Sequence, residues 1–252
     1  MTKIILITGA TSGFGKAIAF KFAQNGYHLI ITGRRKELLD EVAKELVLNY
    51  NVDVLPRCFD IRKPDEVNEA ISGLPDKWKK IDVLVNNAGL AVGLNPIHEG
   101  VTDDWERMID TNVKGLLYMT RQVTPLMVAR KKGHVINIGS VAGREPYPMG
   151  NVYCGAKSAV DAITKGTRLD LVAHNIKVTL IAPGAAETEF SLVRFKGDKE
   201  RADNFYKGYT PLTGDDIAGV VYYVTTLPDH VNINDLVIMP TAQASTVHFF
   251  KK

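Results

Sequence analysis

The chain has 252 residues, of which 45% are hydrophobic and 23% are charged, and its formal net charge at pH 7 is +3. This composition is typical of a globular protein with a sizeable core, and so small a charge gives no reason to expect nucleic acid as a partner. No apolar run approaches the roughly 18 residues that a membrane span needs, so we expect no membrane partner either.

Cysteine and histidine usage bears on metals and on location. Cys58 and Cys154 form neither a disulfide framework nor a metal-ligand pattern, and the six histidines are scattered along the chain. We therefore expect no metal site. The apolar run within residues 1–8 is too short for a signal peptide, and free thiols suit a reducing compartment. These features predict a cytoplasmic protein.

Short β-branched runs alternate with longer helical patterns along the chain. The runs are nearly continuous in apolar residues, as in parallel strands that are covered on both faces. The expected strands are 3–8, 28–32, 52–59, 82–86, 134–139, 177–182 and 236–239. The expected helices are 14–25, 36–49, 64–73, 103–130, 151–174 and 213–227. The pattern predicts an α/β fold of the Rossmann type, a doubly wound, seven-stranded parallel sheet with helices on both faces. No linker or repeat divides the chain, so we expect residues 1–252 to form a single domain.

A glycine-rich turn follows the first expected strand and leads directly into a helix. Glycines tighten such a turn and let phosphate oxygens approach main-chain N–H groups. The spacing differs from the GxGxxG fingerprint, and a tight turn without a ligand is the alternative. The expected cofactor contacts here are Gly9, Thr11, Ser12, Gly13, Phe14 and Gly15.

The end of the second strand indicates which dinucleotide binds. NAD sites usually place an acidic residue there, whereas this chain has Arg34 and Arg35 and no acid before Glu37. Two guanidiniums suit the 2′-phosphate of NADP, although ordinary arginines at a helix start are the alternative. Asp60 and Ile61, after the third strand, are placed to hold the adenine ring.

Two further segments follow strand ends. Asn87, Ala88 and Gly89 close the fourth strand with small residues that suit close packing against the middle of the cofactor, although they are also good turn residues. The connection 184–212 is polar and longer than a connection needs to be. Since such sheets hold ligands past the carboxyl ends of their strands, we interpret 184–212 as a substrate lid.

Tyr153 and Lys157 are four residues apart, so a helix places the phenol and the ammonium on one face. A nearby cation stabilises phenolate, and work at neutral pH requires the phenol pKa to fall by about 3 units from its usual value near 10. Chance alone predicts roughly 0.7 such pairs in a chain of this composition, so the pair gains its weight from the motifs around it.

The glycine turn, Asn87-Ala88-Gly89, Asn112, Ser140, Tyr153-x-x-x-Lys157 and Pro183-Gly184 together resemble the short-chain dehydrogenase/reductase family. The resemblance runs over essentially the whole chain, in order and at the family's spacing. Among the subgroups, the chain is most similar to the NADP-dependent 3-hydroxy acid dehydrogenases, which act on serine and allo-threonine. The stretches that carry this closer likeness are 86–96, 113–120, 191–198 and 230–240.

The resemblance implies a role for each motif residue. Tyr153 is then the general acid/base, and Lys157 holds the nicotinamide ribose and lowers the pKa of Tyr153. Ser140 hydrogen-bonds the substrate oxygen, and Asn112 anchors a water that relays protons from Lys157 to solvent. Preorganised donors aimed at one oxygen suit the charge that hydride transfer leaves there. The remaining cofactor contacts that the resemblance implies are Pro183, Gly184 and Thr188.

A carboxylate-bearing substrate needs a cation near the reacting carbon. Arg144 and Arg194 are the candidates, and Tyr147 is expected to line the pocket beside them. The predicted activity is NADP-dependent oxidation of small 3-hydroxy acids at C3, or the reverse reduction. A general carbonyl or 3-oxoacyl reductase and a non-catalytic NADP-binding regulator remain alternatives. The resemblance also implies a homotetramer.

Overall fold

The computed structural model describes residues 2–252, apart from the side chains of residues 202 and 203, and Met1 of the predicted domain lies outside the described part. Seven strands form one parallel sheet in the order β3-β2-β1-β4-β5-β6-β7, which confirms the predicted fold class. The strands are β1 (Ile4–Thr8), β2 (His28–Gly33), β3 (Val54–Cys58), β4 (Ile81–Asn86), β5 (Gly133–Ile138), β6 (Ile176–Pro183) and β7 (Asp235–Ile238). The order reverses between β1 and β4, and this is where such sheets bind ligands.

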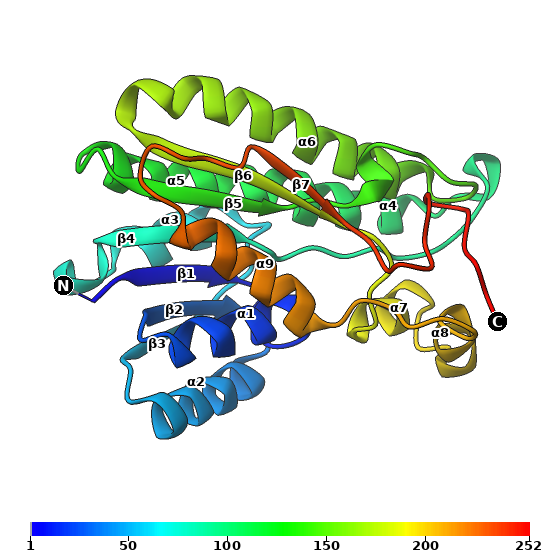
Figure 1. The fold of residues 1–252 in the computed structure, drawn as a ribbon, viewed down its shortest axis with the longest axis horizontal. Coiled ribbons are helices and arrows are strands. Elements are labelled where there is room, and N and C mark those ends of the chain that lie inside the picture. Colours follow the sequence, from blue (N-terminus) through cyan, green and yellow to red (C-terminus); the bar gives the residue numbers. More distant parts are fainter. Residues whose placement is uncertain (1) are drawn as a thin grey trace.

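Helices cover both faces of the sheet (Figure 1). The α-helices are α1 (Gly13–Gln24), α2 (Lys36–Tyr50), α3 (Pro64–Ser72), α4 (Thr102–Ile109), α5 (Leu116–Val128), α6 (Asn151–Leu171), α7 (Glu189–Arg194), α8 (Lys199–Phe205) and α9 (Gly214–Thr226). One face packs against α1, α2 and α9, and the other against α3, α5 and α6. Within residues 2–252, no helix combines the length and the apolar character that crossing a bilayer demands.

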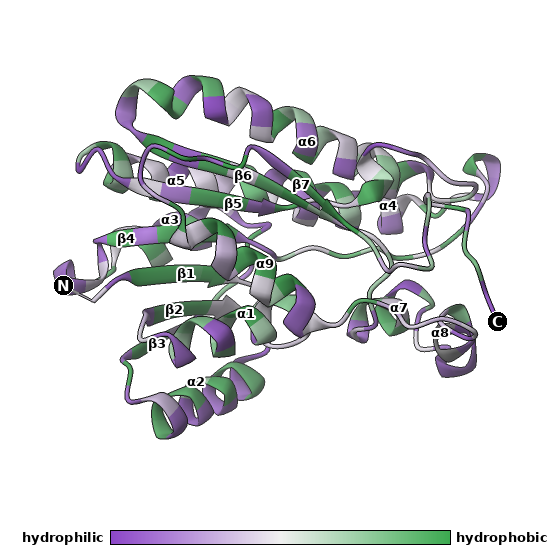
Figure 2. Cartoon of the chain, in the orientation of Figure 1, coloured by the Kyte–Doolittle hydropathy of each residue, from purple (hydrophilic) through white to green (hydrophobic). Residues whose placement is uncertain are grey.

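The strands carry the hydrophobic core, as their hydropathy shows in Figure 2. All five residues of β1 are buried, because helices lie on both sides of this central strand. Pro56 lies within β3, which is an edge strand with β2 as its one neighbour. An edge strand tolerates proline because one row of its N–H groups has no partner strand.

The predicted helix 103–130 is wrong in one respect, because it is interrupted. A π-helical turn over Asp110–Gly115 separates α4 from α5. Within this turn the amide side chain of Asn112 exchanges two hydrogen bonds with the main chain of Leu90, both at 2.8 Å. A π turn widens the helix at a single point and is frequent at functional sites.

The segment 184–212, which we interpret from the sequence as a substrate lid, contains two short helices. Thr188 begins α7 by accepting a hydrogen bond from the N–H of Phe190, and Asp198 begins α8 by accepting one from Arg201. Both helices lie beyond the carboxyl ends of the strands, beside the C-terminal tail (Figure 1). Thr213 and Asp216 then form a capping box that starts α9.

Candidate active site

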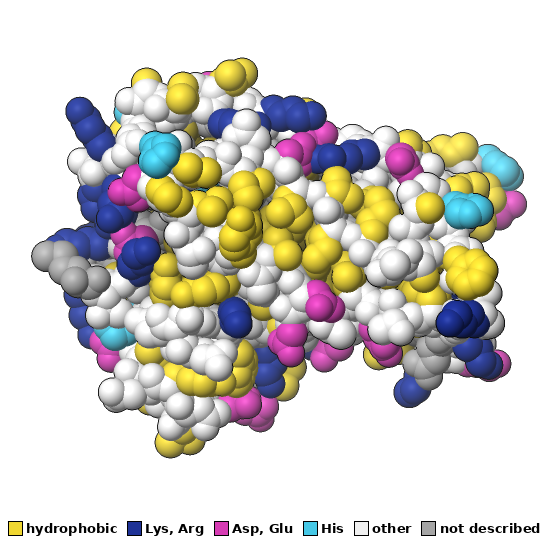
Figure 3. Space-filling view, viewed as in Figure 1, with side chains coloured by type: hydrophobic (Ala, Val, Ile, Leu, Met, Phe, Trp, Pro, Cys, Tyr) yellow, Lys and Arg dark blue, Asp and Glu magenta, His cyan; other side chains and the backbone are white. Residues whose placement is uncertain are grey.

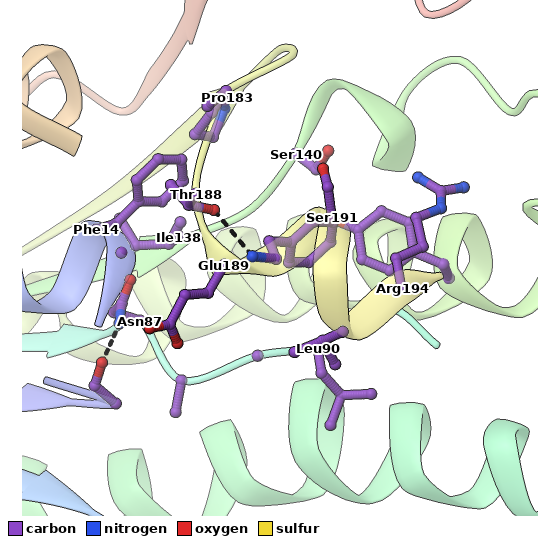
Figure 4. Close-up of a pocket in the computed structure, with 18 of the residues that line it drawn as sticks. Phe14, Asn87, Leu90, Ile138, Ser140, Pro183, Thr188, Glu189, Ser191 and Arg194 are labelled. Carbon is purple, nitrogen blue, oxygen red and sulfur yellow. Dashed lines mark hydrogen bonds between the residues drawn. The ribbon is translucent and has the colours of Figure 1, made fainter. Parts of the chain in front are cut away.

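A cavity of about 460 Å³ opens at the carboxyl ends of the strands, around the point where the strand order reverses. Every predicted cofactor-binding residue except Gly15 lines it, and so do Ser140, Tyr147 and Arg194. Figure 4 shows Phe14 and Asn87 on one side of this cavity and Ser140 and Arg194 on the other. The structure therefore brings the two ends of the predicted site into one space.

The glycine turn allows neighbouring groups to approach its main chain closely. Gly9 has a φ of +69°, and a Cβ on Gly15 would lie 2.2 Å from the carbonyl oxygen of Gly9. Gly15 thus packs the turn instead of lining the cavity. Asn87 braces it by donating to the carbonyl oxygens of Thr8 and Gly9, at 2.8 and 3.2 Å. The residue before α1, Ser12, does not cap the helix, so the first-turn N–H groups are left for an anionic ligand.

Two arginines form the far end of the cavity. Arg35 donates to the hydroxyls of Thr11 and Ser12 at 2.8 and 2.9 Å, and its guanidinium lies 3.3 Å from the carboxylate of Glu189 in the segment 184–212. Arg34 lies 3.7 Å from Asp60.

Asp60 stays ionised at this end of the cavity. Burial alone would raise the pKa of its carboxyl group, but hydrogen bonds from Arg62 and the charges of Arg62 and Arg34 outweigh burial and hold that pKa below its usual value. The residues present fit a phosphate-rich ligand, with Arg34 and Arg35 at the rim.

The predicted catalytic residues meet at the other end. Tyr153 and Lys157 lie on α6, Ser140 follows β5, and Asn112 lies in the π turn. The ammonium of Lys157 donates to the carbonyl oxygen of Ile138 at 2.9 Å. A Cβ on Gly89 would lie 3.0 Å from Oδ1 of Asn112 and 3.6 Å from Nζ of Lys157. The absence of a side chain at position 89 therefore lets these polar groups approach the cavity wall.

Burial shifts the pKa values of both residues of the Tyr-x-x-x-Lys pair. It lowers the pKa of Lys157 to about 8. It raises the pKa of Tyr153, against the opposing effects of a hydrogen bond with Ser140 and of the charge of Arg194. In the protein alone this direction is the reverse of the one the sequence predicts. Burial is the main cause of this direction, and the Lys157 ammonium, which lies 6.0 Å from the centre of the Tyr153 ring and is bonded to a main-chain oxygen, does not offset it.

The two candidate substrate arginines lie in different places. Arg194 lines the cavity, donates to the hydroxyl of Tyr147 at 2.7 Å, and places its guanidinium carbon 5.9 Å from the centre of the Tyr153 ring. Arg144 does not line the cavity, because its guanidinium pairs with Asp235 on β7. The prediction that Arg144 lies at the substrate site is therefore wrong, whereas Arg194 lies in the cavity.

Several lining residues are not predicted individually from the sequence. Phe190, in the segment 184–212, places its ring 5.7 Å from that of Tyr153. Tyr206 bonds Ser191 at 2.5 Å and the carbonyl oxygen of Ala186 at 2.6 Å. Gln243, from the tail, accepts a hydrogen bond from the N–H of Ala185 at 2.8 Å. For the lining residues within 184–212, the only feature of the sequence that predicts a role is the length of this segment. The segment has no internal spacing pattern that would single out individual residues.

Comparisons with known proteins agree with this geometry. The family model described as short chain dehydrogenase matches residues 3–198. The chain is 51% identical over 242 residues to the NADP-dependent 3-hydroxy acid dehydrogenase YdfG of Salmonella typhi, covering 96% of each protein. It is 46% identical over 245 residues to sulfoacetaldehyde reductase 2 of Chromohalobacter salexigens, covering 97% of this chain and 96% of that protein.

A comparison with solved structures also finds a similar dehydrogenase. The closed form of a serine dehydrogenase complexed with NADP+ superposes with a TM-score of 0.92 at 47% identity, over 99% of both chains. The match of the family model over most of the chain, the close relatives and the shared architecture lead to one conclusion: the chain belongs to the short chain dehydrogenase family.

Proposed function

We propose that this enzyme oxidises the C3 hydroxyl of small 3-hydroxy acids with NADP, or catalyses the reverse reduction. Serine, allo-threonine, 3-hydroxyisobutyrate and 3-hydroxypropionate are the substrates of this type. The observation that carries the proposal is the position of the Arg194 guanidinium, 5.9 Å from the centre of the Tyr153 ring in the same cavity. A molecule with one carbon between its carboxylate and its hydroxyl carbon is short enough to reach both groups at once.

The side chains divide the chemistry between them. When bound, the nicotinamide of NADP supplies the hydride acceptor. Tyr153 takes the proton of the C3 hydroxyl, and Ser140 hydrogen-bonds the same oxygen. Lys157 binds the nicotinamide ribose and lowers the pKa of Tyr153 in the complex, and Asn112 anchors the water that relays protons from Lys157. Arg194 binds the carboxylate and so holds C3 towards Tyr153.

NADP is the proposed cofactor because of the charges at the far end of the cavity. Arg34 and Arg35 follow β2, whose last residue is Gly33, and the chain has no acidic residue directly after this strand, where NAD-binding sites usually place one to accept from the ribose 2′-hydroxyl. Thr188 lies against the glycine turn, with its Cβ 3.5 Å from the position a Cβ on Gly13 would take. In the proposal Thr188 contacts the carboxamide, next to Pro183 and Gly184. NADP-dependent relatives support this assignment.

We further propose a cytoplasmic homotetramer. Apolar side chains gather over β7 and α9 on the face shown in Figure 3, and exposed Val237 and Tyr223 belong to these elements. Leu117 on α5 and Leu169 on α6 are exposed as well. An edge strand and long helices with exposed apolar residues support burial against further copies of the chain. Free Cys58 and Cys154 suit a reducing compartment.

Substrate and cofactor preference can be tested in one screen. Purified enzyme is assayed with 3-hydroxyisobutyrate, 3-hydroxypropionate, L-serine and L-allo-threonine, each with NADP and with NAD. We expect turnover of these acids with NADP, at a kcat/KM at least about tenfold above that with NAD, roughly 1.4 kcal/mol of discrimination. Sulfoacetaldehyde, bulky ketones and acyl thioesters are assayed in the reductive direction.

Each of the other outcomes of the screen indicates a different activity for this protein. Turnover confined to sulfoacetaldehyde would indicate the aldehyde-reducing activity for which sulfoacetaldehyde reductase 2 is named. Activity confined to ketones or thioesters indicates a general carbonyl or 3-oxoacyl reductase and defeats the proposal. Tight NADP binding without turnover of any of these compounds indicates a cofactor-binding regulator.

A further inference from the structure

The lid is fastened to the body of the protein directly beside Arg194. The carbonyl oxygen of Arg194 accepts a hydrogen bond from the N–H of Gly93 at 3.1 Å. Two residues further on, the ammonium of Lys196 lies 2.7 Å from Oδ2 of Asp104 on α4. These contacts tie the end of α7 to two segments that lie about a hundred residues earlier in the sequence.

Asp104 is an unusual partner because it is buried. Its side chain is 6% exposed, whereas that of Lys196 is 51% exposed. Gly93 has a φ of +73°, and a Cβ there would lie 2.8 Å from Oδ2 of Asp104, so the glycine lets the carboxylate reach the lid. Arg107 is further away, at 3.8 Å from Oδ1. A buried carboxylate needs a cation close by, so this geometry favours a lid that stays attached through Lys196.

A small cavity is lined by both Asp104 and Arg194. This cavity has a volume of about 20 Å³ and is lined by residues that include Asp104, Arg194 and Tyr153. Nε of Arg194 is buried and has no hydrogen-bond partner among the side chains and main-chain groups that the structure describes. A volume of roughly 10–15 Å³ is enough for one water. A water in this space can accept from Nε of Arg194 and donate to the Asp104 carboxylate.

We infer that Asp104 is a positioning residue for Arg194. It acts through Lys196, which fixes the end of α7, and through a buried water that orients the guanidinium. The effect is to hold Arg194 against Tyr147 and beside Tyr153, ready for an anionic substrate group. The inference rests on the proposed function in one respect, namely that Arg194 binds the substrate's carboxylate.

The test compares a charged substrate with a neutral analogue. The readout is the ratio of kcat/KM for 3-hydroxyisobutyrate to kcat/KM for its methyl ester, measured with NADP. The variants are Lys196→Met, Asp104→Asn and Lys196→Arg, with Arg194→Met as the reference. Lys207→Met is the matched control, because it removes one positive charge from the same lid at an exposed position.

We expect Lys196→Met and Asp104→Asn each to lower the acid-to-ester ratio about fivefold, mainly through KM for the acid. Lys196→Arg keeps the ratio within about twofold of wild type, and the double variant falls no further than the worse single variant, as for residues that act as a unit. A merely structural role would lower both substrates' rates together and leave the ratio unchanged.

The reference variant separates this inference from the proposed function. If Arg194→Met lowers the ratio but Lys196→Met and Asp104→Asn leave it at the Lys207→Met value, Asp104 does not position Arg194 and the inference is overturned. If Arg194→Met itself leaves the ratio unchanged, the carboxylate-binding part of the proposed function is at fault, and the inference falls with it. If Asp104→Asn fails to fold, the exposed Lys196→Met variant decides the matter alone.

Discussion

The ammonium of Lys157 lies over the face of the Tyr153 ring, 6.0 Å from its centre, and donates to the carbonyl oxygen of Ile138 at 2.9 Å. Burial raises the pKa of Tyr153 and lowers that of Lys157 to about 8. The protein alone therefore does not hold a phenolate at neutral pH. The positive charge that activates the phenol has to increase when the cofactor enters, since a nicotinamide ring in its oxidised form is itself cationic.

The pKa of Tyr153 is thus expected to depend on the ligand. Titration of phenolate absorbance, taken as the difference between wild type and Tyr153→Phe, should give a pKa above 10 for the protein alone and a lower one with oxidised NADP. Tyr153→Phe should reduce kcat by on the order of 10³-fold, the size of a general acid/base contribution, while the Kd for NADP stays within about twofold. A variant that keeps a tenth of wild-type turnover would remove Tyr153 from the mechanism.

Lys157 illustrates a conflict between stability and activity. Its folded-state pKa of about 8 lies below its ordinary value of 10.5. The buried charge therefore destabilises the fold fully below pH 8, and the penalty is relieved as the pH rises from 8 to 10.5. At pH 7 this amounts to about 3 kcal/mol, offset by about 1 kcal/mol for the bond to Ile138.

Lys157→Met should accordingly raise the free energy of unfolding at pH 7 by about 1–2 kcal/mol while turnover is lost. Urea denaturation at pH 7 and pH 9.5 measures the effect, and the stability gain should shrink at the higher pH. Lys165→Met is the control on the same helix, because Lys165 is exposed and pairs with Asp161. A variant less stable than wild type at pH 7 contradicts this account.

The parts of the fold and the site that follow from local patterns could be predicted. The strands were readable because a fully covered parallel strand is a continuous apolar run, and the glycine turn because its residues adjoin β1. Lys157 and Tyr153 share a helix, so their proximity also follows from spacing. The direction of the Lys157 ammonium does not, since it depends on the carbonyl oxygen of Ile138 on another element.

The side-chain contacts that could not be predicted involve partners that are distant in sequence. Arg144 and Arg194 look equivalent as candidate carboxylate ligands. Only the position of Asp235, 91 residues from Arg144, shows that the first is already paired. The side chain of Asn112 in the π turn likewise bonds the main chain of Leu90, 22 residues earlier. A periodic pattern indicates which face of a helix is buried, but it does not indicate which residue contacts a given side chain on that face.

The separation of the two arginines gives a direct prediction. Arg194→Ala should raise KM for 3-hydroxyisobutyrate by at least about tenfold, because a carboxylate in a partly buried site loses its hydrogen-bonded cation. Arg144→Ala should change KM by less than about twofold, since its pair with Asp235 is about one-third exposed and such pairs are worth little. Steady-state kinetics on both variants measure this. Equal effects of the two substitutions would restore Arg144 as a substrate residue.

His134 makes the fold sensitive to acid. It is buried on β5, bonded to the hydroxyl of Thr179 at 2.8 Å, and burial lowers its pKa from 6.5 to about 3. The unfolded chain therefore binds a proton between pH 6.5 and 3 that the folded chain does not, and stability falls as the pH drops through this window. The loss attributable to His134 is about 2 kcal/mol at pH 5.

Removing this histidine should reduce the loss of unfolding free energy between pH 7 and pH 5. In His134→Gln, the difference in unfolding free energy between pH 7 and pH 5 should be smaller than in wild type by about 2 kcal/mol. His98→Gln is the control, because the His98 side chain is 74% exposed and should leave the difference unchanged. An unaltered slope in His134→Gln would show that His134 is protonated in the folded state at pH 5.

Glu189 should weaken NADP binding selectively. Its carboxylate lies 3.3 Å from the Arg35 guanidinium, which also bonds Thr11 and Ser12 at the glycine turn. A 2′-phosphate has to compete with Glu189 for Arg35, whereas a 2′-hydroxyl has no charge to compete with. Because the ion pair is about half exposed, the competition is worth at most about 1 kcal/mol, or roughly fivefold in Kd.

Glu189→Gln should therefore tighten NADP binding about two- to fivefold, leave the Kd for NAD unchanged, and lose this gain at high salt. Calorimetric titration with both cofactors at two ionic strengths measures the effect. Glu187→Gln is the matched control, because it removes the same charge from the same segment at an exposed position that does not line the cavity. Weaker NADP binding in Glu189→Gln would mean the opposite, that the carboxylate holds Arg35 in place for the phosphate and does not compete with it.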